Sequence, residues 1–189
     1  MKKQAIILAA LIGAAGAQAQ SAPQSSPSFY VTAAGGSSQA NLDCTGTTAC
    51  DKSDTGVKLV GGYQFGNGLS LELGYISFGK FSARDNTLAL TLKSKAILLG
   101  GAYALPLSSD WGLNMRLGLA QVKTTGDATS GSATGSVSKS KAKTYVGAGV
   151  TYAVSPAIKI ELAADATEAE IAGQKGSMRL FSLGATFAF

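Results

Sequence analysis

From about residue 28 onward, apolar and polar side chains alternate along the chain with a period of two. This alternation predicts β-strands whose two faces meet different environments. The clearest examples are the segments VKLVGGYQF, LSLELGY, LNMRLGL, AIKIELA and the closing FSLGATFAF. Three further segments, SFYVTAAGG, AILLGGAYAL and TYVGAGVTYAV, bring the predicted count to eight strands. Helical spacing is not found over any long stretch after the first 20 residues, so the pattern predicts an all-β protein.

The predicted connections alternate in length. Short turns are expected at residues 66–68, 106–112 and 155–156. Longer polar loops are expected at about residues 38–54, 79–90, 124–142 and 167–176. The glycine-rich stretch at residues 131–141 is expected to be a flexible surface loop. Because every second connection is long, the pattern predicts an antiparallel up-and-down sheet with an even number of strands.

The charged residues of the predicted strands indicate which face lies inside. Five of them lie opposite the large apolar side chains, on a face rich in glycine: Lys58, Glu72, Arg116, Lys159 and Glu161. A soluble barrel such as a lipocalin would place its apolar face inside, and unpaired charges in a soluble core would be costly. The narrow interior of an eight-stranded barrel can hold glycines and paired charges. The sequence therefore predicts an eight-stranded antiparallel up-and-down transmembrane β-barrel with its apolar face toward lipid.

Aromatic residues gather at the short-turn end of the predicted strands. They are Tyr63, Phe65, Tyr103, Trp111, Tyr152, Phe187 and Phe189. This position is typical of the aromatic girdle at a membrane interface, although scattered core aromatics are an alternative interpretation. An aromatic last residue is unusual for a solvated chain end, and Phe189 is therefore expected to close the barrel at the membrane boundary.

The first 20 residues, MKKQAIILAALIGAAGAQAQ, have the features of a secretory signal. Lys2 and Lys3 precede an apolar run, and Ala17-Gln18-Ala19 supplies a cleavage motif. The alternative, a membrane-spanning helix, needs roughly 20 apolar residues. We therefore expect residues 1–19 to be a signal peptide and residues 20–189 to form one barrel domain.

The net charge and the two cysteines indicate no binding partner or metal site, and only a disulfide is expected from them. Loss of the two signal lysines lowers the formal net charge from +5 to +3, which gives no reason to expect a nucleic acid partner. The close pair Cys44 and Cys50 indicates a disulfide in an exported protein, and closing so short a loop contributes only roughly 2 kcal/mol. A metal site is the alternative, but two cysteines without histidine supply too few ligands. No cofactor is expected.

Over its mature length the chain resembles the small eight-stranded bacterial outer-membrane barrels of the OmpA transmembrane-domain and OmpX type. Its last residues match the family's C-terminal assembly signal: Ser182, Gly184, Phe187 and Phe189. The resemblance implies an integral protein of the bacterial outer membrane, delivered by periplasmic chaperones and the outer-membrane assembly machinery. The sequence stops at the last predicted strand, so the wall-anchoring role of full-length OmpA is not expected.

The resemblance also suggests a role for the inward charges, because OmpA-type barrels contain an interior salt-bridge network. The candidate members are Lys58, Glu72, Arg116, Lys159, Glu161 and Asp165. We favour mutual neutralisation in a plugged lumen over gating, since buried ion pairs are not in themselves functional.

Binding is a more plausible activity than catalysis. Barrel enzymes of this membrane use a histidine as general base, and this chain has none. Basic residues near the second and third predicted loops are candidate contacts for lipopolysaccharide phosphates: Lys80, Arg84, Lys93, Lys95, Lys139 and Lys141. The alternative is that these side chains are merely solvated.

Three functions follow from these observations. The first is a non-enzymatic outer-membrane barrel with a structural or surface-interaction role, in which the long loops contact lipopolysaccharide, host surfaces or neighbouring proteins. The second is a narrow channel for ions or small solutes, although side chains normally fill the lumen of eight strands. The third is a secreted soluble β-barrel.

Overall fold

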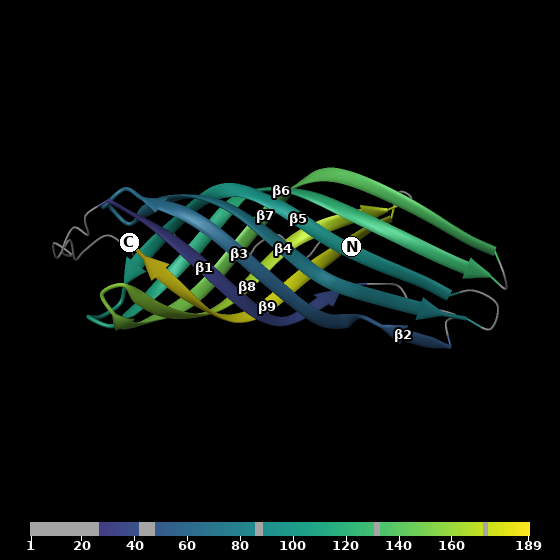
Figure 1. The fold of residues 1–189 in the computed structure, drawn as a ribbon, viewed down its shortest axis with the longest axis horizontal. Coiled ribbons are helices and arrows are strands. Elements are labelled where there is room, and N and C mark those ends of the chain that lie inside the picture. Colours follow the sequence, from purple (N-terminus) through teal and green to yellow (C-terminus); the bar gives the residue numbers. More distant parts are fainter. Residues whose placement is uncertain (1–26, 42–47, 86–88, 131–132, 172–173) are drawn as a thin grey trace, which may run out of the picture.

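The computed structural model of the protein describes residues 27–41, 48–85, 89–130, 133–171 and 174–189. Its strands (Figure 1) are β1 (Ser28–Ala40), β2 (Ala49–Asp51), β3 (Ser53–Gln64), β4 (Leu69–Arg84), β5 (Ala89–Pro106), β6 (Trp111–Ser130), β7 (Ala133–Ser155), β8 (Ile158–Ile171) and β9 (Gln174–Ala188). In the ranges given above, no helix is long and apolar enough to cross a membrane.

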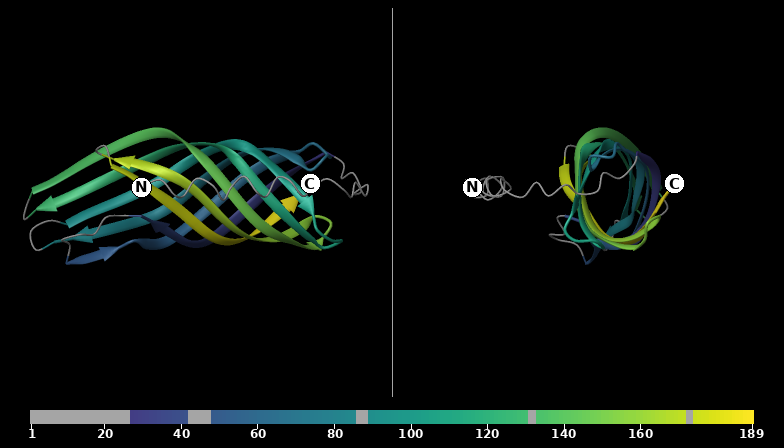
Figure 2. Two further views of the ribbon diagram at one scale, coloured as in Figure 1. Left: turned by 180° about the vertical axis from the view of Figure 1, so that it is seen from behind. Right: turned by 90° about the vertical axis from the view of Figure 1, so that its left-hand side faces the viewer.

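Eight long strands form a closed barrel, and β2 is a short addition to it. Each long strand pairs antiparallel with the next one along the chain, and β1 pairs with β9 to complete the ring. The view along the barrel in Figure 2 shows this closure. A closed ring pairs the backbone polar groups that lipid cannot satisfy. The predicted eight-stranded up-and-down barrel is therefore confirmed.

The outer surface of the barrel is apolar, as the alternation predicts. Leu71, Leu117 and Leu183 point outward and are 54%, 65% and 61% exposed. Their chain neighbours Glu72 and Arg116 point inward and are buried. An exterior of large aliphatic side chains suits hydrocarbon and not water, so the predicted orientation of the two faces is confirmed.

The short turns lie together at one end of the barrel, which we call the short-turn end. The C-terminus also lies there (Figure 1). In the first turn Gly66 and Gly68 have positive φ angles of 84° and 85°, a conformation that glycine adopts without steric cost. The backbone N–H of Phe65 donates to the carbonyl of Leu69 at 2.9 Å and closes this turn.

Exposed aromatic rings surround the short-turn end, as predicted. The ring centroids of Trp111 and Tyr152 are 5.0 Å apart. Those of Phe29 and Tyr63 are 4.9 Å apart, so Phe29 joins the group that the sequence analysis named. Such a ring of aromatic side chains is typical of a membrane interface.

The long connections predicted as loops are mostly strand. At the opposite end of the barrel, called the long-hairpin end, β6 and β7 remain paired up to Ser130 opposite Ala133. β4 and β5 remain paired up to Arg84 opposite Ala89. The prediction of a flexible loop at residues 131–141 is wrong for residues 133–141, which belong to β7. Antiparallel pairing satisfies the backbone whatever the side chains are, so the ladders continue after the alternation in hydropathy has ended.

Part of the sheet extends beyond the closed barrel at the long-hairpin end. β7 and β8 pair only as far as Tyr145 opposite Thr167, whereas β4, β5, β6 and β7 stay paired with one another beyond that point. The hairpin of β6 and β7 can be followed in green away from the yellow strands in Figure 1. β2 pairs with the outer part of β4, at Asp51 opposite Ser82. One edge of this extension is thus covered by the chain itself, and the edge of β7 at residues 133–144 is open in the described part of the protein.

Candidate functional site

The middle of the lumen contains an ion-pair cluster built from β4, β6 and β8. Arg116 Nη1 and Nη2 donate to Glu161 Oε1 and Oε2 at 2.5 and 2.9 Å. On its other side, Arg116 Nε donates to Glu72 Oε2 at 3.1 Å. The Arg116 side chain is 1% exposed. A bidentate guanidinium–carboxylate pair has a fixed geometry, so one arginine holds two carboxylates from different strands in place.

A second buried ion pair joins β3 to β8. Lys58 Nζ lies 2.6 Å from Asp165 Oδ2, and the hydroxyl of Tyr145 donates to Asp165 Oδ1. The hydroxyl of Tyr30 donates to Glu72 Oε1 at 2.7 Å. Buried charges are tolerated when their hydrogen-bonding groups are satisfied. These two tyrosines, which the sequence analysis did not include, therefore belong to the lumen cluster.

Glycine makes room for these carboxylates, as expected for a narrow lumen. A Cβ atom at Gly147 would lie 2.6 Å from Asp165 Oδ1, and one at Gly149 would lie 2.5 Å from Glu161 Oε1. Both glycines belong to β7, which carries no charged residue at this level of the lumen. The side chains of Asp165 and Glu161 on β8 thus pack against the backbone of β7 at these two glycines.

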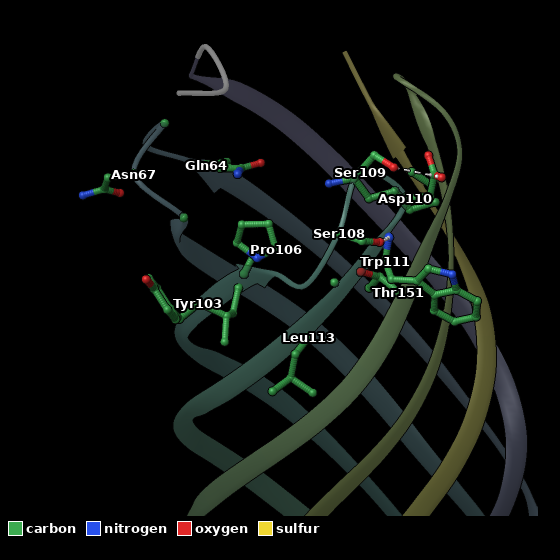
Figure 3. Close-up of a pocket in the computed structure, with 17 residues that line it drawn as sticks. Gln64, Asn67, Tyr103, Pro106, Ser108, Ser109, Asp110, Trp111, Leu113 and Thr151 are labelled. Atoms are coloured by element: carbon green, nitrogen blue, oxygen red, sulfur yellow. Dashed lines mark hydrogen bonds between the residues drawn. The ribbon is translucent and has the colours of Figure 1, made fainter. Parts of the chain in front are cut away.

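Lys159 lies apart from the other predicted members of the network. In the described part of the chain it forms no ion pair, and it lines a cavity of about 350 Å³ at the short-turn end. Figure 3 shows this cavity between the turn that carries Asn67 and the turn that carries Ser108, Ser109 and Asp110. Asp110 is its other charged lining residue. The cavity thus lies at the rim of the barrel, and only two of its lining residues are charged.

Toward the long-hairpin end, a layer of apolar side chains fills the lumen. We call this layer the apolar plug. Its members are Ile76, Phe78, Phe81, Leu98, Val122, Met178 and Leu180, each 4% exposed or less. The prediction of an inner face made of small and charged residues did not include this layer, because it lies where the sequence indicates the ends of strands and the starts of loops. The plug closes the lumen on the long-hairpin side of the ion pairs.

A bulge in β4 places two phenylalanines of the plug inside the barrel. The register of β4 against β5 shifts between Ser77 and Lys80, and Gly79 has a φ of +77°. Phe78 and Phe81 are three positions apart, and yet both are buried in the lumen. Regular alternation would place them on opposite faces, so the bulge is what brings them together.

Polar groups from β1 and β3 hold the bulge. Asp54 Oδ2 accepts the backbone N–H of Lys80 at 2.5 Å, and Asp54 Oδ1 accepts that of Thr55 at 2.7 Å. These backbone hydrogen bonds lower the pKa of the Asp54 carboxyl below its ordinary value. The hydroxyl of Ser38 donates to the carbonyl oxygen of Phe78 at 2.5 Å. The kinked backbone therefore has specific partners on both sides of Gly79.

Four lysines form a compact group on the outward face, next to the bulge. We call Lys80, Lys93, Lys95 and Lys123 the outer basic cluster. Lys80 lies opposite Lys93, and Lys95 lies opposite Lys123. They line a hollow of about 280 Å³. Ile97, two residues after Lys95 on the outward face of β5, is exposed. The cluster therefore borders the apolar band.

Charge in the outer basic cluster is poorly balanced by the protein. Lys93 Nζ lies 3.3 Å from Asp127 Oδ2. In the described ranges, Lys80, Lys95 and Lys123 form no ion pair with a carboxylate. Like charges directly opposite each other on neighbouring strands are destabilising. The arrangement is therefore suited to an anion outside the barrel.

The other predicted basic contacts lie elsewhere. Arg84 is exposed at the end of β4, farther from the apolar band than Lys80. Lys139 and Lys141 are on β7 and lie opposite Thr124 and Val122, whose side chains are buried in the barrel. They are thus on the face that continues the lumen, away from the outer basic cluster.

Two further predictions fall on residues outside the described ranges. Cys44 is one of these residues, so its disulfide with Cys50 of β2 stays a prediction. The signal peptide, residues 1–19, is also outside them. The C-terminal residues, in contrast, are described in full.

The last strand closes the barrel at its final residue. The backbone N–H of Phe189 donates to the carbonyl of Phe29 at 2.9 Å. Phe187 and Phe189 point outward and are 50% and 77% exposed. Ser182 is buried, and at Gly184 a Cβ atom would lie 2.5 Å from the carbonyl oxygen of Ala33 on β1. Of the four residues named as the assembly signal, two therefore face out and two adjoin the lumen or the closing seam.

Comparison with known proteins gives one family and several similar structures. The sequence profile of the OmpA-like transmembrane domain matches residues 24–189. No sequence among the curated proteins matches the chain.

The similar structures are bacterial outer-membrane barrels. The attachment invasion locus protein Ail of Yersinia pestis superposes with a TM-score of 0.60 at 17% identity, covering 87% of this chain and 100% of Ail. Neisserial surface protein A gives a TM-score of 0.62 at 18% identity, with 87% and 100% covered. The N-terminal barrel domain of Pseudomonas aeruginosa OprF gives 0.53 at 15% identity, with 86% and 97% covered. At these identities the likeness concerns the fold.

Proposed function

The chain belongs to the OmpA-like transmembrane domain family, and from that premise we propose that this outer-membrane barrel is a non-enzymatic surface protein that binds lipopolysaccharide phosphates. The observation that carries the proposal is the outer basic cluster. In the orientation we propose, the long-hairpin end faces the outside of the cell and the short-turn end faces the periplasm.

The position of the outer basic cluster matches that of lipid phosphates. Lys95 precedes exposed Ile97 by two residues on the same face of β5, a separation of about 7 Å along a strand. Lysine side chains at the edge of an apolar band extend toward the polar interface. Two opposed lysine pairs, Lys80 with Lys93 and Lys95 with Lys123, gain most from a ligand that carries several negative charges. Lipopolysaccharide phosphates supply such charges in the outer leaflet.

Neutralising Lys95 and Lys123 together is expected to weaken lipopolysaccharide binding. At about 1 kcal/mol for each lysine near an anionic surface, the variant Lys95→Gln with Lys123→Gln loses about 2 kcal/mol, which is about thirtyfold in affinity. The measurement is binding of fluorescent lipopolysaccharide to the barrel in phospholipid nanodiscs, with dephosphorylated lipopolysaccharide as the competing ligand.

The matched control for this experiment is Lys139→Gln with Lys141→Gln, which changes the net charge equally on the other face. We expect it to bind lipopolysaccharide like the unmodified protein. Equal losses in both variants would show that only net charge matters, and equal binding of the dephosphorylated lipid would contradict the proposed contact.

The alternatives are less well supported. A channel needs an open path, whereas the ion-pair cluster and the apolar plug occupy successive levels of the lumen. A soluble barrel would have to expose Leu71, Leu117 and Leu183 to water. The sequence has no histidine, so catalysis would need a different general base.

Contacts with other molecules at the cell surface are a second part of the proposal. The Ail protein of Yersinia pestis has been solved in complex with the heparin analogue sucrose octasulfate. For the present chain, the surface offered to host or neighbouring molecules is the sheet extension at the long-hairpin end. Its strands carry Lys139 and Lys141 at exposed positions.

We expect the C-terminal segment to direct assembly by the outer-membrane machinery after delivery by periplasmic chaperones. Deleting Phe189 should reduce the membrane-inserted fraction strongly, because the deletion removes both the terminal aromatic ring and the final pairing with Phe29. The measurement is the heat-dependent gel shift of the outer-membrane fraction, which reports the folded barrel. Phe189→Tyr keeps an aromatic ring and the pairing and serves as the control. Normal insertion of the deletion variant would refute the assignment.

A further inference from the structure

The lumen contains two adjoining cavities at the short-turn end of the barrel. The cavity of about 350 Å³ at the rim is followed by a smaller one of about 60 Å³. Gln64, Ala104, Thr151 and Lys159 line both of them. Figure 3 shows Gln64 of β3 and Thr151 of β7 at the larger cavity. Because they share these residues, we treat the two cavities as one space and call it the vestibule.

The vestibule ends at the ion-pair cluster. Tyr30 lines the smaller cavity, and its hydroxyl donates to Glu72 Oε1 at 2.7 Å. Arg116 holds the lumen at this level, and the apolar plug closes it farther along. A small molecule that enters from the short-turn end therefore has no onward path through the described lumen. A cavity closed at its inner end is suited to binding and not to transport.

Most side chains of the smaller cavity carry a hydroxyl or an amide group. These residues are Tyr30, Gln64, Ser70, Asn114, Thr151 and Thr186. The others are alanines and Lys159. Hydroxyl and amide side chains can both donate and accept hydrogen bonds, which is what the hydroxyl groups of a sugar require. The lining therefore favours a ligand with several hydroxyl groups.

Two groups in the vestibule have no partner among the described residues. Lys159 forms no ion pair there, and Glu161, two positions away on the same face of β8, has both carboxylate oxygens bound by Arg116. Asn114 Oδ1 is buried and accepts no hydrogen bond. An unsatisfied buried acceptor is costly. A ligand that carries an anionic group and a hydroxyl would satisfy both Lys159 and Asn114.

These groups together define the ligand. We propose that the vestibule binds a small polyhydroxylated carboxylate, that is, a sugar acid, whose carboxylate contacts Lys159 and whose hydroxyl donates to Asn114 Oδ1. An anion without a hydroxyl would leave Asn114 unsatisfied, and a neutral sugar would leave Lys159 without a counter-charge. Asp110, the other charged lining residue, is exposed at the rim and accepts a hydrogen bond from Ser109 at 3.1 Å.

The probes are three compounds of equal chain length that differ in the groups the site requires. Gluconate has the carboxylate and the hydroxyls, sorbitol has an alcohol in place of the carboxylate, and hexanoate lacks the hydroxyls. Binding is measured by saturation-transfer NMR on the full barrel in phospholipid nanodiscs, where both ends are accessible, with empty nanodiscs as the blank. We expect gluconate to bind about tenfold more tightly than either analogue, because each analogue loses a hydrogen-bonding partner of the site.

Two protein variants separate the contributions of charge and hydrogen bonding. Lys159→Gln is expected to weaken gluconate binding about tenfold, the usual value of a hydrogen bond to a charged group. Asn114→Leu removes the buried acceptor and is expected to weaken it about fivefold. Lys139→Gln, the matched control, changes the net charge equally at the other end of the barrel and should bind gluconate normally. Lys95→Gln with Lys123→Gln should also bind it normally, whether or not the lipid proposal holds.

Other outcomes would overturn the inference. Equal binding of sorbitol and gluconate, or unchanged gluconate binding by Lys159→Gln, would exclude the contact with the carboxylate. Equal binding of hexanoate would exclude the role of the hydroxyl groups, and no saturation transfer to gluconate would exclude the site as a whole. The heat-dependent gel shift verifies that each variant is folded. If Lys159→Gln does not fold, the comparison of the three compounds on the unmodified protein still decides.

Discussion

Replacing Arg116 with methionine is expected to lower the free energy of unfolding by about 3–5 kcal/mol, the usual loss when one partner of a buried ion pair is removed. Arg116 contacts both Glu72 and Glu161 in the middle of the lumen. Its loss leaves two carboxylates buried without their cation. The measurement is urea-induced unfolding of the barrel in lipid vesicles, followed by the fluorescence of Trp111, the single tryptophan of the chain.

Two variants test the reason for this loss. Lys159→Met removes a cation that has no ion-pair partner in the described structure, and we expect a change below about 1 kcal/mol, as for solvated charges. Adding Glu72→Gln and Glu161→Gln to Arg116→Met should restore much of the stability, because no uncompensated charge remains. A loss in Arg116→Met no larger than that in Lys159→Met would mean that the cluster does not hold the lumen together.

Replacing Phe78 with alanine is expected to lower the free energy of unfolding by about 3–5 kcal/mol, as for other fully buried phenylalanines. Phe78 is 0% exposed at the centre of the apolar plug. Phe181, which faces outward and is 46% exposed, is the matched control. Phe181→Ala should cost less, because lipid fills the space that the ring leaves. Unfolding in lipid vesicles again provides the measurement.

The same residues test whether the plug seals the barrel. In planar bilayers the unmodified protein is expected not to conduct, and Phe78→Ala with Phe81→Ala is expected to show conductance events if the protein stays folded. Steady conductance by the unmodified barrel would favour a channel. A stability loss in Phe181→Ala as large as that in Phe78→Ala would contradict the special position of the plug.

Within the membrane-spanning part, the sequence was enough to predict the fold. Alternation placed Leu117 outside and Arg116 inside because lipid and lumen impose different demands on the two faces of every strand. The ion pairs of Lys58 with Asp165 and of Arg116 with Glu72 and Glu161 then need only the pairing order of the strands. Tyr30 and Tyr145 lie on the inward face by the same alternation and could have been named from it.

Beyond the membrane-spanning part, the same signal no longer applies. Residues 133–142 of β7 are exposed on both faces, so they show no apolar period, and their strand conformation comes from pairing with β6. The plug was missed for another reason. Phe78 and Phe81 share a face only because of the bulge, whose position depends on contacts of Asp54 and Ser38 that are distant in sequence.

The bulge at Gly79 shifts the alternation of inward-facing and outward-facing side chains along β4 by one residue. Before it, even-numbered residues such as Glu72 and Phe78 point into the barrel; after it, the odd-numbered Phe81 does so and Lys80 points out. Without this change of parity, Lys80 would enter the lumen beside the plug and Phe81 would take its place outside. The inward position of Phe81 in the apolar plug and the outward position of Lys80 in the outer basic cluster therefore both depend on the bulge at Gly79.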